Sequence, residues 1–347
     1  MLYVDMDYFY AACEELRHPE LRGKAFVVGT SPPETKESGV IQTCTYPARK
    51  FGIKSGMSTA FAFKLKPDLI YLQADEPYYE GISQKIFDIL RSYKYKMEIL
   101  SVDEAALDLG DSEYDKAKAL GFSIKNRIKN EMNLDASIGI SYGKVFAKMA
   151  CDASKPNGLL LIKKEEILDF IKDKPISALP GIGRKTGGKL KSMNINTIGE
   201  LAKANPLKLI EWFGSYGSDL YQQANGIDNS RIEESSTILS LSREKVIPPN
   251  FDPDALYDIL KPLAEDLVKD AISKKLMFKT ISVKAVFQDY STSVKSITLN
   301  NYSSSLELVL KAVRSIIPKL VSETRPARKI GVRISSLIDV KGQKTLF

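Results

Sequence analysis

The sequence contains very few residues of the kinds that serve as nucleophile partners or zinc ligands. It holds one histidine, His18, and three cysteines, Cys13, Cys44 and Cys151, which are odd in number and far apart. These counts argue against a disulfide framework and against a zinc site. A serine or cysteine nucleophile would depend on His18 alone. We therefore expect any chemistry to use carboxylates, lysine, arginine, tyrosine or a metal.

Long hydrophobic runs are also missing. No apolar stretch approaches the roughly 20 residues that cross a bilayer, and Asp5 and Asp7 interrupt the region where a signal peptide would be apolar. Hydrophobic residues make up 44% of the chain and charged residues 27%, a balance typical of globular proteins. We expect a cytoplasmic, monomeric protein that does not span a membrane. The 347 residues favour two to four domains.

An excess of positive charge is absent from the first two thirds of the chain. Residues 1–240 hold 32 basic and 32 acidic side chains, whereas residues 241–347 hold 18 and 11. The whole net charge of +7 therefore belongs to the last third. A basic segment attached to a neutral body indicates a polyanion partner, either nucleic acid or an acidic membrane surface. The alternative is a basic surface that only aids solubility.

Strand and helix patterns alternate through residues 1–8 and 76–162, as in an α+β sheet. Leu2–Val4 is a short apolar run that ends at an aspartate, as a buried strand presenting a carboxylate would. Ile99–Leu109 predicts one strand with two acids in its middle, and Tyr114–Met132 has the apolar periodicity of a helix.

The remainder of the chain divides into a helical part and a second α+β part. Residues 165–229 predict helices only, and residues 231–236 are polar and charged, as in a linker. The last third predicts the order β-α-β-β-α-β, the split βαβ module. Its first helix begins after Asp252, which precedes a proline, and its second begins with a capping box at Ser304.

Two adjacent carboxylates, Asp103 and Glu104, lie within an apolar segment. In a straight strand they point to opposite faces, and burial of an unpaired charge is costly. A bound cation would offset this cost, and Asp5 could supply a third oxygen ligand. Oxygen ligands without histidine or cysteine favour Mg²⁺ over zinc. The alternatives are that Asp103 and Glu104 face solvent at an edge or turn, and that Asp7 is a structural acid.

Three segments offer cations or backbone donors that suit phosphate groups. Tyr46-Pro47-Ala48-Arg49 brings a hydroxyl and a guanidinium within one turn, and Lys155 lies in a turn after a helix. Alone, each segment is more consistent with a solvated surface than with a phosphate site. Gly181-Ile182-Gly183 predicts a hairpin whose N–H groups point at an anion, and Arg184 and Lys185 make a DNA phosphate the expected anion. The alternative is a tight turn that binds nothing.

The strands of the last third predict a sheet with one apolar and one polar face. Val283 and Ala285 alternate with Lys284, while Lys295 and Arg333 lie in neighbouring strands, with a facing that depends on register. If helices cover the apolar face, the other is free for a phosphate backbone, bound without base specificity.

Together these segments resemble the Y family of lesion-bypass DNA polymerases, especially the archaeal and polymerase IV-like branch. The resemblance runs nearly end to end. The motifs that carry it are VDMDYFYA (Val4–Ala11), TYPARKFGIKSGM (Thr45–Met57), SVDEAALD (Ser101–Asp108), SIGIS (Ser137–Ser141), KVFAKMACDASKPNG (Lys144–Gly158) and LPGIG (Leu179–Gly183).

The resemblance implies an α+β multidomain fold shaped like a right hand. It implies a ferredoxin-like palm, small fingers, a helical thumb with a helix-hairpin-helix, and a β-α-β-β-α-β little finger. The boundaries that we expect are 1–8 and 76–162 for the palm, 9–75 for the fingers, 163–229 for the thumb, 230–240 for the linker, 241–341 for the little finger and 342–347 for a C-terminal tail.

The resemblance also implies roles for particular residues. Two Mg²⁺ ions would be held by Asp5, Asp103 and Glu104, with the Met6 carbonyl as a further ligand. Tyr10 resembles the steric gate that selects deoxynucleotides by excluding a 2′-hydroxyl. The residues expected to bind the triphosphate are Tyr46, Arg49 and Lys155, with Thr43 nearby.

The implied activity is template-directed addition of deoxynucleotides to a primer 3′-hydroxyl, with low fidelity and without proofreading. The partners would be primer–template DNA and a dNTP. The C-terminal Gln343–Phe347 resembles the start of a sliding-clamp-binding peptide. Two alternatives remain open, a two-metal nucleotide cyclase and a non-catalytic DNA-binding protein. The basic C-terminal part disfavours the first, and the three acids disfavour the second.

Overall fold

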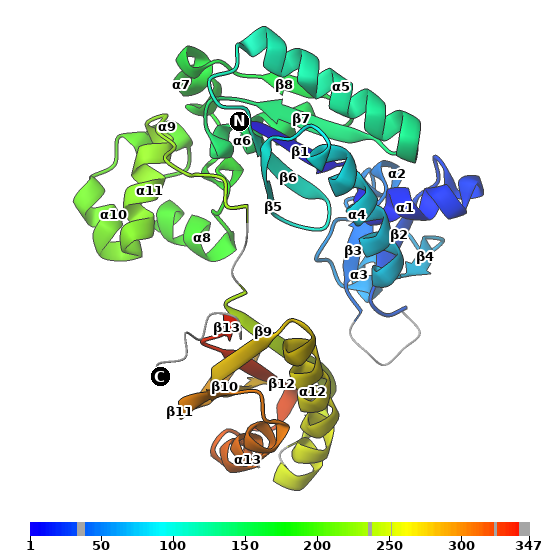
Figure 1. Ribbon diagram of the computed structural model, residues 1–347, viewed down its shortest axis with the longest axis vertical. Coiled ribbons are helices and arrows are strands. Elements are labelled where there is room, and N and C mark those ends of the chain that lie inside the picture. Colours follow the sequence, from blue (N-terminus) through cyan, green and yellow to red (C-terminus); the bar gives the residue numbers. More distant parts are fainter. Residues whose placement is uncertain (33–38, 235–237, 251, 323–324, 340–347) are drawn as a thin grey trace, which may run out of the picture. The chain divides into compact units, whose positions relative to one another are not determined.

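The computed structural model describes residues 1–32, 39–234, 238–250, 252–322 and 325–339. The chain divides into two compact units, Met1–Ser236 and Thr237–Phe347 (Figure 1). Within the described residues, no helix combines the length and apolar character that a membrane span requires. The two units have separate hydrophobic cores.

A five-stranded sheet forms the centre of the first unit, with the strand order β5-β6-β1-β7-β8. All neighbouring strands are antiparallel except β7 and β8. As a result, β1 and β5 are parallel with β6 between them, and β6 and β7 are parallel with β1 between them. This is the split arrangement of a ferredoxin-like sheet. The strands are β1 (Leu2–Met6), β5 (Lys96–Ile99), β6 (Glu104–Asp108), β7 (Ala136–Ile140) and β8 (Leu159–Leu161).

Helices cover both faces of this sheet. On one face, α4 (Glu76–Arg91) and α5 (Tyr114–Met132) pack against apolar residues of β1, β6 and β7. On the other, α6 (Lys144–Ser154) lies directly on β7. A Cβ atom at Gly139 would lie 1.9 Å from the Ala147 carbonyl oxygen. Glycine is therefore required at this position for α6 to approach the sheet so closely.

Residues 9–75 form a smaller layer that is inserted between β1 and α4. Its sheet has the order β3-β2-β4, and a small separate core holds it together. Thr45 and Ser58 cap two of its helices through their hydroxyl groups. The elements are α1 (Phe9–Arg17), η1 (Pro19–Leu21), β2 (Phe26–Gly29), β3 (Ile41–Cys44), α2 (Tyr46–Arg49), α3 (Thr59–Leu65) and β4 (Ile70–Gln73).

The helical prediction for residues 165–229 is confirmed, and these helices share a core with α6. The Asp228 carboxylate accepts a hydrogen bond of 2.7 Å from the Val145 backbone N–H, which ties the end of the bundle to α6. The helices are η2 (Lys164–Glu166), α7 (Ile167–Ile171), η3 (Ile176–Ala178), α8 (Arg184–Ser192), α9 (Ile198–Ala202), α10 (Pro206–Phe213) and α11 (Ser215–Ala224).

The second unit has the predicted order β-α-β-β-α-β. Its sheet order is β11-β10-β12-β9, all neighbours are antiparallel, and a short β13 pairs with β10. Both helices pack on one face, and the predicted alternation of Val283 and Ala285 with Lys284 is confirmed. The elements are β9 (Ser240–Asn250), α12 (Pro253–Ser273), β10 (Leu276–Phe287), β11 (Thr292–Ser303), α13 (Leu306–Ile316), η4 (Ile317–Lys319), β12 (Ala327–Ser335) and β13 (Ile338–Asp339).

Two local predictions were wrong. Ile99–Leu109 is not one strand, because β5 ends at Ile99 and β6 begins at Glu104 with a bend between them. A straight strand would have turned one of two adjacent acids into the apolar core beneath α4 and α5, and the bend avoids this cost. The cap of α13 is Ser305 rather than Ser304, since the Ser305 hydroxyl accepts the Leu308 N–H.

Candidate active site

The pairing of β1 with β6 brings two of the predicted acids together. Asp5 lies directly opposite Glu104 in this antiparallel pair, so the two side chains share one face of the sheet. The Asp5 side chain is only 4% exposed. The Met6 backbone N–H donates a 3.0 Å hydrogen bond to the Asp103 carbonyl, which places the bend beside the end of β1. Asp5 and Glu104 therefore meet across the strand pair, and Asp103 lies in the bend beside them.

Two lysines from the α6 region reach these carboxylates. The Lys148 Nζ atom lies 2.8 Å from Asp5 Oδ2, is in direct contact with Glu104 Oε1, and lies 3.1 Å from Asp152 Oδ1. The Lys155 Nζ atom lies 2.6 Å from Asp5 Oδ1. Lys155 was predicted as a phosphate-binding residue, whereas the sequence contained no signal that separated Lys148 from an ordinary helical lysine.

The pKa values of the acids reflect burial and the two lysine charges. Burial and the nearby Asp5 charge raise the pKa of Asp103, although a 2.6 Å hydrogen bond from the Ser101 hydroxyl opposes this effect. Burial raises the pKa of Glu104 as well. Burial also acts to raise the pKa of Asp5, but its hydrogen bond with Glu104 and the lysine charges outweigh that effect and lower the pKa.

The oxygen donors at this edge fit a hard divalent cation. Carboxylates and a main-chain carbonyl are the ligands that Mg²⁺ prefers. Among the described residues, no three acidic, cysteine or histidine side chains form a ready-made metal cluster. Lys148 instead bridges Asp5 and Glu104, and Asp103 accepts the Ser101 hydroxyl. The oxygen donors are therefore of the kind that Mg²⁺ prefers, and the Lys148 ammonium group contacts those of Asp5 and Glu104.

Asp7 lies beside this site but has protein partners of its own. Its carboxylate accepts hydrogen bonds from the Ser137 hydroxyl at 2.9 Å, the Asn157 backbone N–H at 2.6 Å and the Tyr46 hydroxyl at 3.3 Å. Burial is the main cause of its raised pKa. These contacts favour the structural alternative for Asp7, because its oxygens already join three separate segments.

The predicted triphosphate residues of the inserted layer lie on β3 and α2. The Arg49 guanidinium lies 4.8 Å from the Tyr46 ring centre, and the Tyr8 ring meets the same ring edge-on. Arg49 forms no ion pair with any residue that the structure describes. Thr43 pairs with Val28 in the sheet. Through the bond to Asp7, Tyr46 connects this layer to the carboxylate site.

A stack of two tyrosines supports the predicted steric gate. The Tyr10 ring stacks on Tyr79 with 4.3 Å between ring centres. The Tyr79 hydroxyl donates a 2.5 Å hydrogen bond to Glu14, and Arg17 forms an ion pair with the same carboxylate. The sequence did not indicate Tyr79, because a tyrosine on the apolar side of a helix is typical of a core residue.

The glycine hairpin is a tight turn before α8, but its Ile182 and Gly183 N–H groups donate to the Leu179 and Gly181 carbonyl oxygens and do not point at an anion as predicted. Gly181 has φ of 90°, which disfavours other residues, and Gly183 is the N-cap of α8. A Cβ atom on Gly181 would also lie 3.0 Å from the Tyr216 hydroxyl. Arg184 and Lys185 begin α8 and are exposed. The helix start is therefore open to an anion.

In the second unit, register decides which basic residues share a face. Arg333 lies opposite Ser282 and Lys284 opposite Gly331, so both point away from the helices. Lys295 lies opposite Val283, a core residue, and points to the helix-covered side at the edge strand β11. Of the three residues of this sheet that were considered for DNA contact, Lys284 and Arg333 lie on the open face and Lys295 does not.

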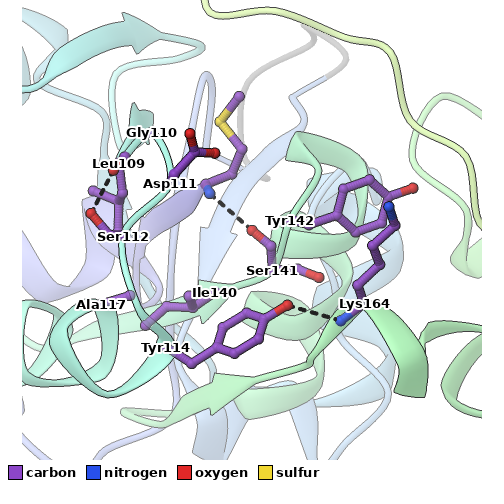
Figure 2. Close-up of a pocket in the computed structure, with 11 residues that line it drawn as sticks. Leu109, Gly110, Asp111, Ser112, Tyr114, Ala117, Ile140, Ser141, Tyr142 and Lys164 are labelled. Atoms are coloured by element: carbon purple, nitrogen blue, oxygen red, sulfur yellow. Dashed lines mark hydrogen bonds between the residues drawn. The ribbon is translucent and has the colours of Figure 1, made fainter.

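A cavity of about 390 Å³ lies at the other end of β1, away from the acids. Figure 2 shows hydrogen bonds between several of its lining residues, whereas the Asp111 carboxylate has no partner among the residues drawn. The Met1 amine donates to the Ser141 carbonyl at 2.9 Å, and the Tyr114 hydroxyl accepts the Lys164 backbone N–H at 3.1 Å. None of the three predicted ligand acids lines this cavity, so it is not the candidate site.

Family models match three stretches of the chain. Residues 4–152 match the impB/mucB/samB family, residues 239–346 match the C-terminal domain of that family, and residues 177–228 match the DNA polymerase-iota thumb domain. The matched ranges follow the order of the carboxylate sheet, the helical bundle and the second unit.

Named relatives agree with this assignment over nearly the full chain. The chain is 39% identical to DNA polymerase IV of Methanosarcina acetivorans, with 100% of this chain and 98% of the relative covered. It is 34% identical to DNA polymerase IV of Clostridium perfringens, with 97% and 94% covered.

Among solved structures, a Y-family DNA polymerase chimera matches with a TM-score of 0.86 and 28% identity, covering 97% of this chain and 99% of that one. The insertion ternary complex of Dbh DNA polymerase matches with a TM-score of 0.68 and 28% identity over the same shares. With its three acids gathered at the end of β1 and its helical and C-terminal parts matched in order, the chain belongs to the Y family of DNA polymerases.

Proposed function

We propose that this chain adds deoxynucleotides to a primer 3′-hydroxyl through a site built on Asp5, Asp103 and Glu104, and that it copies damaged as well as intact template. The observation that carries this assignment is the Asp5–Glu104 pairing across β1 and β6, with Asp103 in the adjoining bend. Adjacent buried acids favour a divalent cation as well as the two lysine partners that they have, and a primer terminus and a triphosphate are the groups that such cations serve.

Y-family polymerases depend on divalent metal ions, and the donor set described above fits one. We assign the ligands to Asp5, Asp103, Glu104 and the Met6 carbonyl, and the metal to two Mg²⁺ ions. Bound there, Mg²⁺ supplies acidification of the attacking hydroxyl and neutralisation of the leaving pyrophosphate. The role of the protein is to hold these oxygens rigidly, since both strands that carry Asp5 and Glu104 pair on either side within the sheet.

The incoming nucleotide is assigned to the residues between the carboxylates and the inserted layer. Arg49 and Tyr46 lie together and would bind the triphosphate with Lys155, and Thr43 lies on the adjacent strand. Lys155 must then exchange its contact with Asp5 for a phosphate oxygen. Tyr10 would exclude a 2′-hydroxyl, and its stacking on Tyr79 fixes the ring against displacement.

Duplex DNA is assigned to the start of α8 and to the open face of the second unit. The backbone N–H groups of Arg184 and Lys185 at the start of α8 suit a phosphate, and the side chains of the same residues can pair with it. On the open sheet, Arg333 and Lys284 stand among serines and threonines that can also bind phosphate oxygens. Lys295 would contact DNA only at the sheet edge.

The division into palm, fingers, thumb and little finger, with the boundaries given above, and the monomeric state are part of the same proposal. The clamp-binding assignment rests on Gln343–Phe347, which lie outside the described residues. A nucleotide cyclase does not need to bind duplex DNA, so the exposed start of α8 and the basic open sheet argue against it. A non-catalytic DNA-binding protein does not need Asp5, Asp103 and Glu104 close together.

Primer extension with Mg²⁺ on undamaged and abasic templates tests this function. We expect extension on both templates and misincorporation without excision, as in a polymerase without proofreading. Incubation with dNTPs in the absence of primer controls for cyclase chemistry. Formation of cyclic nucleotide, or binding of DNA without extension under any metal condition, would contradict the proposal.

A further inference from the structure

Lys148 makes the contacts that most directly affect the carboxylate site, although no role follows for it from the sequence. Its ammonium group lies against Asp5, Glu104 and Asp152, which matches the three N–H donors of a lysine. Its side chain is 19% exposed, and the Nζ atom lies 5.0 Å from the centre of the Tyr3 ring. The group is therefore enclosed on several sides and held in one place.

Of the two lysines near the acids, only Lys148 bridges them. Lys155 contacts Asp5 but not Glu104, and its distance to Asp152 is 3.8 Å. Asp5 and Glu104 face each other across an antiparallel pair, where Cβ atoms are about 5 Å apart. Asp5 is buried and Glu104 is partly exposed, and without a cation between them two ionised carboxylates at that spacing repel each other.

The place of Lys148 follows from the close packing of α6. Gly139 leaves room for the Ala147 carbonyl and the Cys151 backbone on the sheet. Lys148, adjacent to Ala147 in the sequence, then extends over Tyr3 toward the end of β1. Asp152 lies one helical turn further on, so the ammonium group has a partner that is not part of the predicted ligand set.

We propose that Lys148 is a positioning residue that holds Asp5 and Glu104 together in the metal-free enzyme and competes with the divalent cation for the same oxygens. The inference rests on the proposed function, because it assumes that these acids are metal ligands. Entry of the cation is an exchange, in which the ammonium group leaves Asp5 and Glu104 and keeps Asp152. Asp152 therefore lowers the cost of each exchange.

The test is metal binding by the full chain without DNA or nucleotide. Mn²⁺ binding is measured by electron paramagnetic resonance, and the melting temperature is measured with and without Mg²⁺. Lys148→Met keeps the aliphatic stem and removes the charge. We expect this variant to bind Mn²⁺ about fivefold more tightly than the wild type. Without metal it should melt at a lower temperature, and Mg²⁺ should raise its melting temperature by more than it raises that of the wild type. Lys148→Arg keeps the charge and should resemble the wild type.

A matched control separates this effect from a general loss of positive charge. Lys144 lies one turn earlier on α6 and pairs with Glu98 at 2.8 Å, away from the three acids. Lys144→Met should leave the Mn²⁺ affinity unchanged. Asp152→Asn should weaken Mn²⁺ binding, because the displaced ammonium group loses its alternative partner, and this effect should vanish in the Lys148→Met background.

Three outcomes would overturn the inference or its basis. Unchanged or weaker Mn²⁺ binding by Lys148→Met would show that the lysine does not compete with the cation. If Lys148→Met does not fold, a wild-type Mn²⁺ affinity in Asp152→Asn would contradict the exchange. If Asp103→Asn leaves wild-type Mn²⁺ binding intact, the metal assignment itself fails, and that result is distinct from the first two.

Discussion

The carboxylate site of the first unit and the open sheet of the second unit solve opposite charge problems in the same way. In the first, Lys148 and Lys155 neutralise acids that are expected to bind cations. In the second, a single acid, Glu244, lies 2.8 Å from Lys284, which is proposed to bind a DNA phosphate, and is in direct contact with Lys329. Each region is therefore neutralised internally, and ligand binding must exchange one partner for another.

This comparison shows that a count of charges overstates what a surface offers to a ligand. The last third of the chain carries the whole excess of +7, yet two lysines near its open face share one glutamate. Arg333 on that face forms no ion pair with any residue in the described part of the chain. Burial acts to raise the pKa of Glu244, but the two lysines outweigh burial and lower that pKa. Removal of a neutralising partner should therefore strengthen binding, whereas removal of a residue that itself binds the ligand should weaken it.

The largest effect on primer extension should come from removal of a metal-binding carboxylate in the carboxylate site of the first unit. Asp103→Asn should reduce primer extension by about 10³-fold, because a loss of roughly 4 kcal/mol of transition-state stabilisation corresponds to that factor. Fold stability should hold, since burial already raises the pKa of this acid and its charge is costly. Single-turnover extension and duplex binding are measured together. Asp108→Asn, at the far end of β6, is the matched control, and rapid extension by Asp103→Asn would reject the metal assignment.

A second experiment tests whether the carboxylate site depends on shape as well as on charge. Tyr10→Ala changes no charge but removes the ring that stacks on Tyr79. We expect ribonucleotide incorporation to rise by about tenfold or more relative to deoxynucleotide incorporation, because the exclusion is steric. Competition between rNTP and dNTP measures the ratio. Tyr10→Phe keeps the ring and should retain wild-type selection, and equal selection by the alanine variant would remove the gate role.

The third prediction tests how far DNA binding depends on the second region. Removal of residues 237–347 leaves the cores of the first unit intact. Affinity for primer–template DNA should fall by about tenfold or more, and the salt dependence should flatten by roughly 0.9 for each DNA phosphate that the protein no longer neutralises. Fluorescence anisotropy across a salt series checks both. An unaltered salt slope would place the duplex-binding residues in the first unit.

The smallest effect should come from Glu244, the neutralising acid of the second region. Glu244→Gln frees Lys284 and Lys329, so DNA affinity should rise by about threefold at low salt and the salt slope should steepen by about 1 to 2. Glu265→Gln, on α12, makes the same charge change on the helical side and controls for net charge. Equal effects of the two variants would show that only total charge matters.

Much of the fold could be predicted because its signals are local. Apolar alternation, the Asp252 cap and helical periodicity each depend on residues that are close in sequence, and the structure has these elements where they were expected. The hairpin between β5 and β6 was missed because the apolar run continues up to Ser101 and the turn contains no glycine or proline. Local hydrogen bonds from Leu100 and Ser101 to the Glu104 carbonyl, and from the Ser101 hydroxyl to Asp103, close it instead.

The candidate site was predictable only through its motifs. Asp5, Asp103 and Glu104 were expected to meet, and the structure brings them to one edge, but the register that aligns them depends on pairing across about 100 residues. Lys148 and Tyr79 were missed because a lysine or tyrosine on a helix gives no sign of what it faces. The side of the sheet on which Lys295 lies likewise follows from pairing alone.

The alignment of Asp5 with Glu104 also makes the enzyme intolerant of small errors in length. Because successive side chains of a strand point to opposite faces, one residue inserted within Leu2–Val4 would turn Asp5 toward α4 and α5. A β-bulge, at a register shift like that between β10 and β11, is the one way to absorb such a residue. Insertions or deletions in β1 that no bulge absorbs should therefore leave an inert protein.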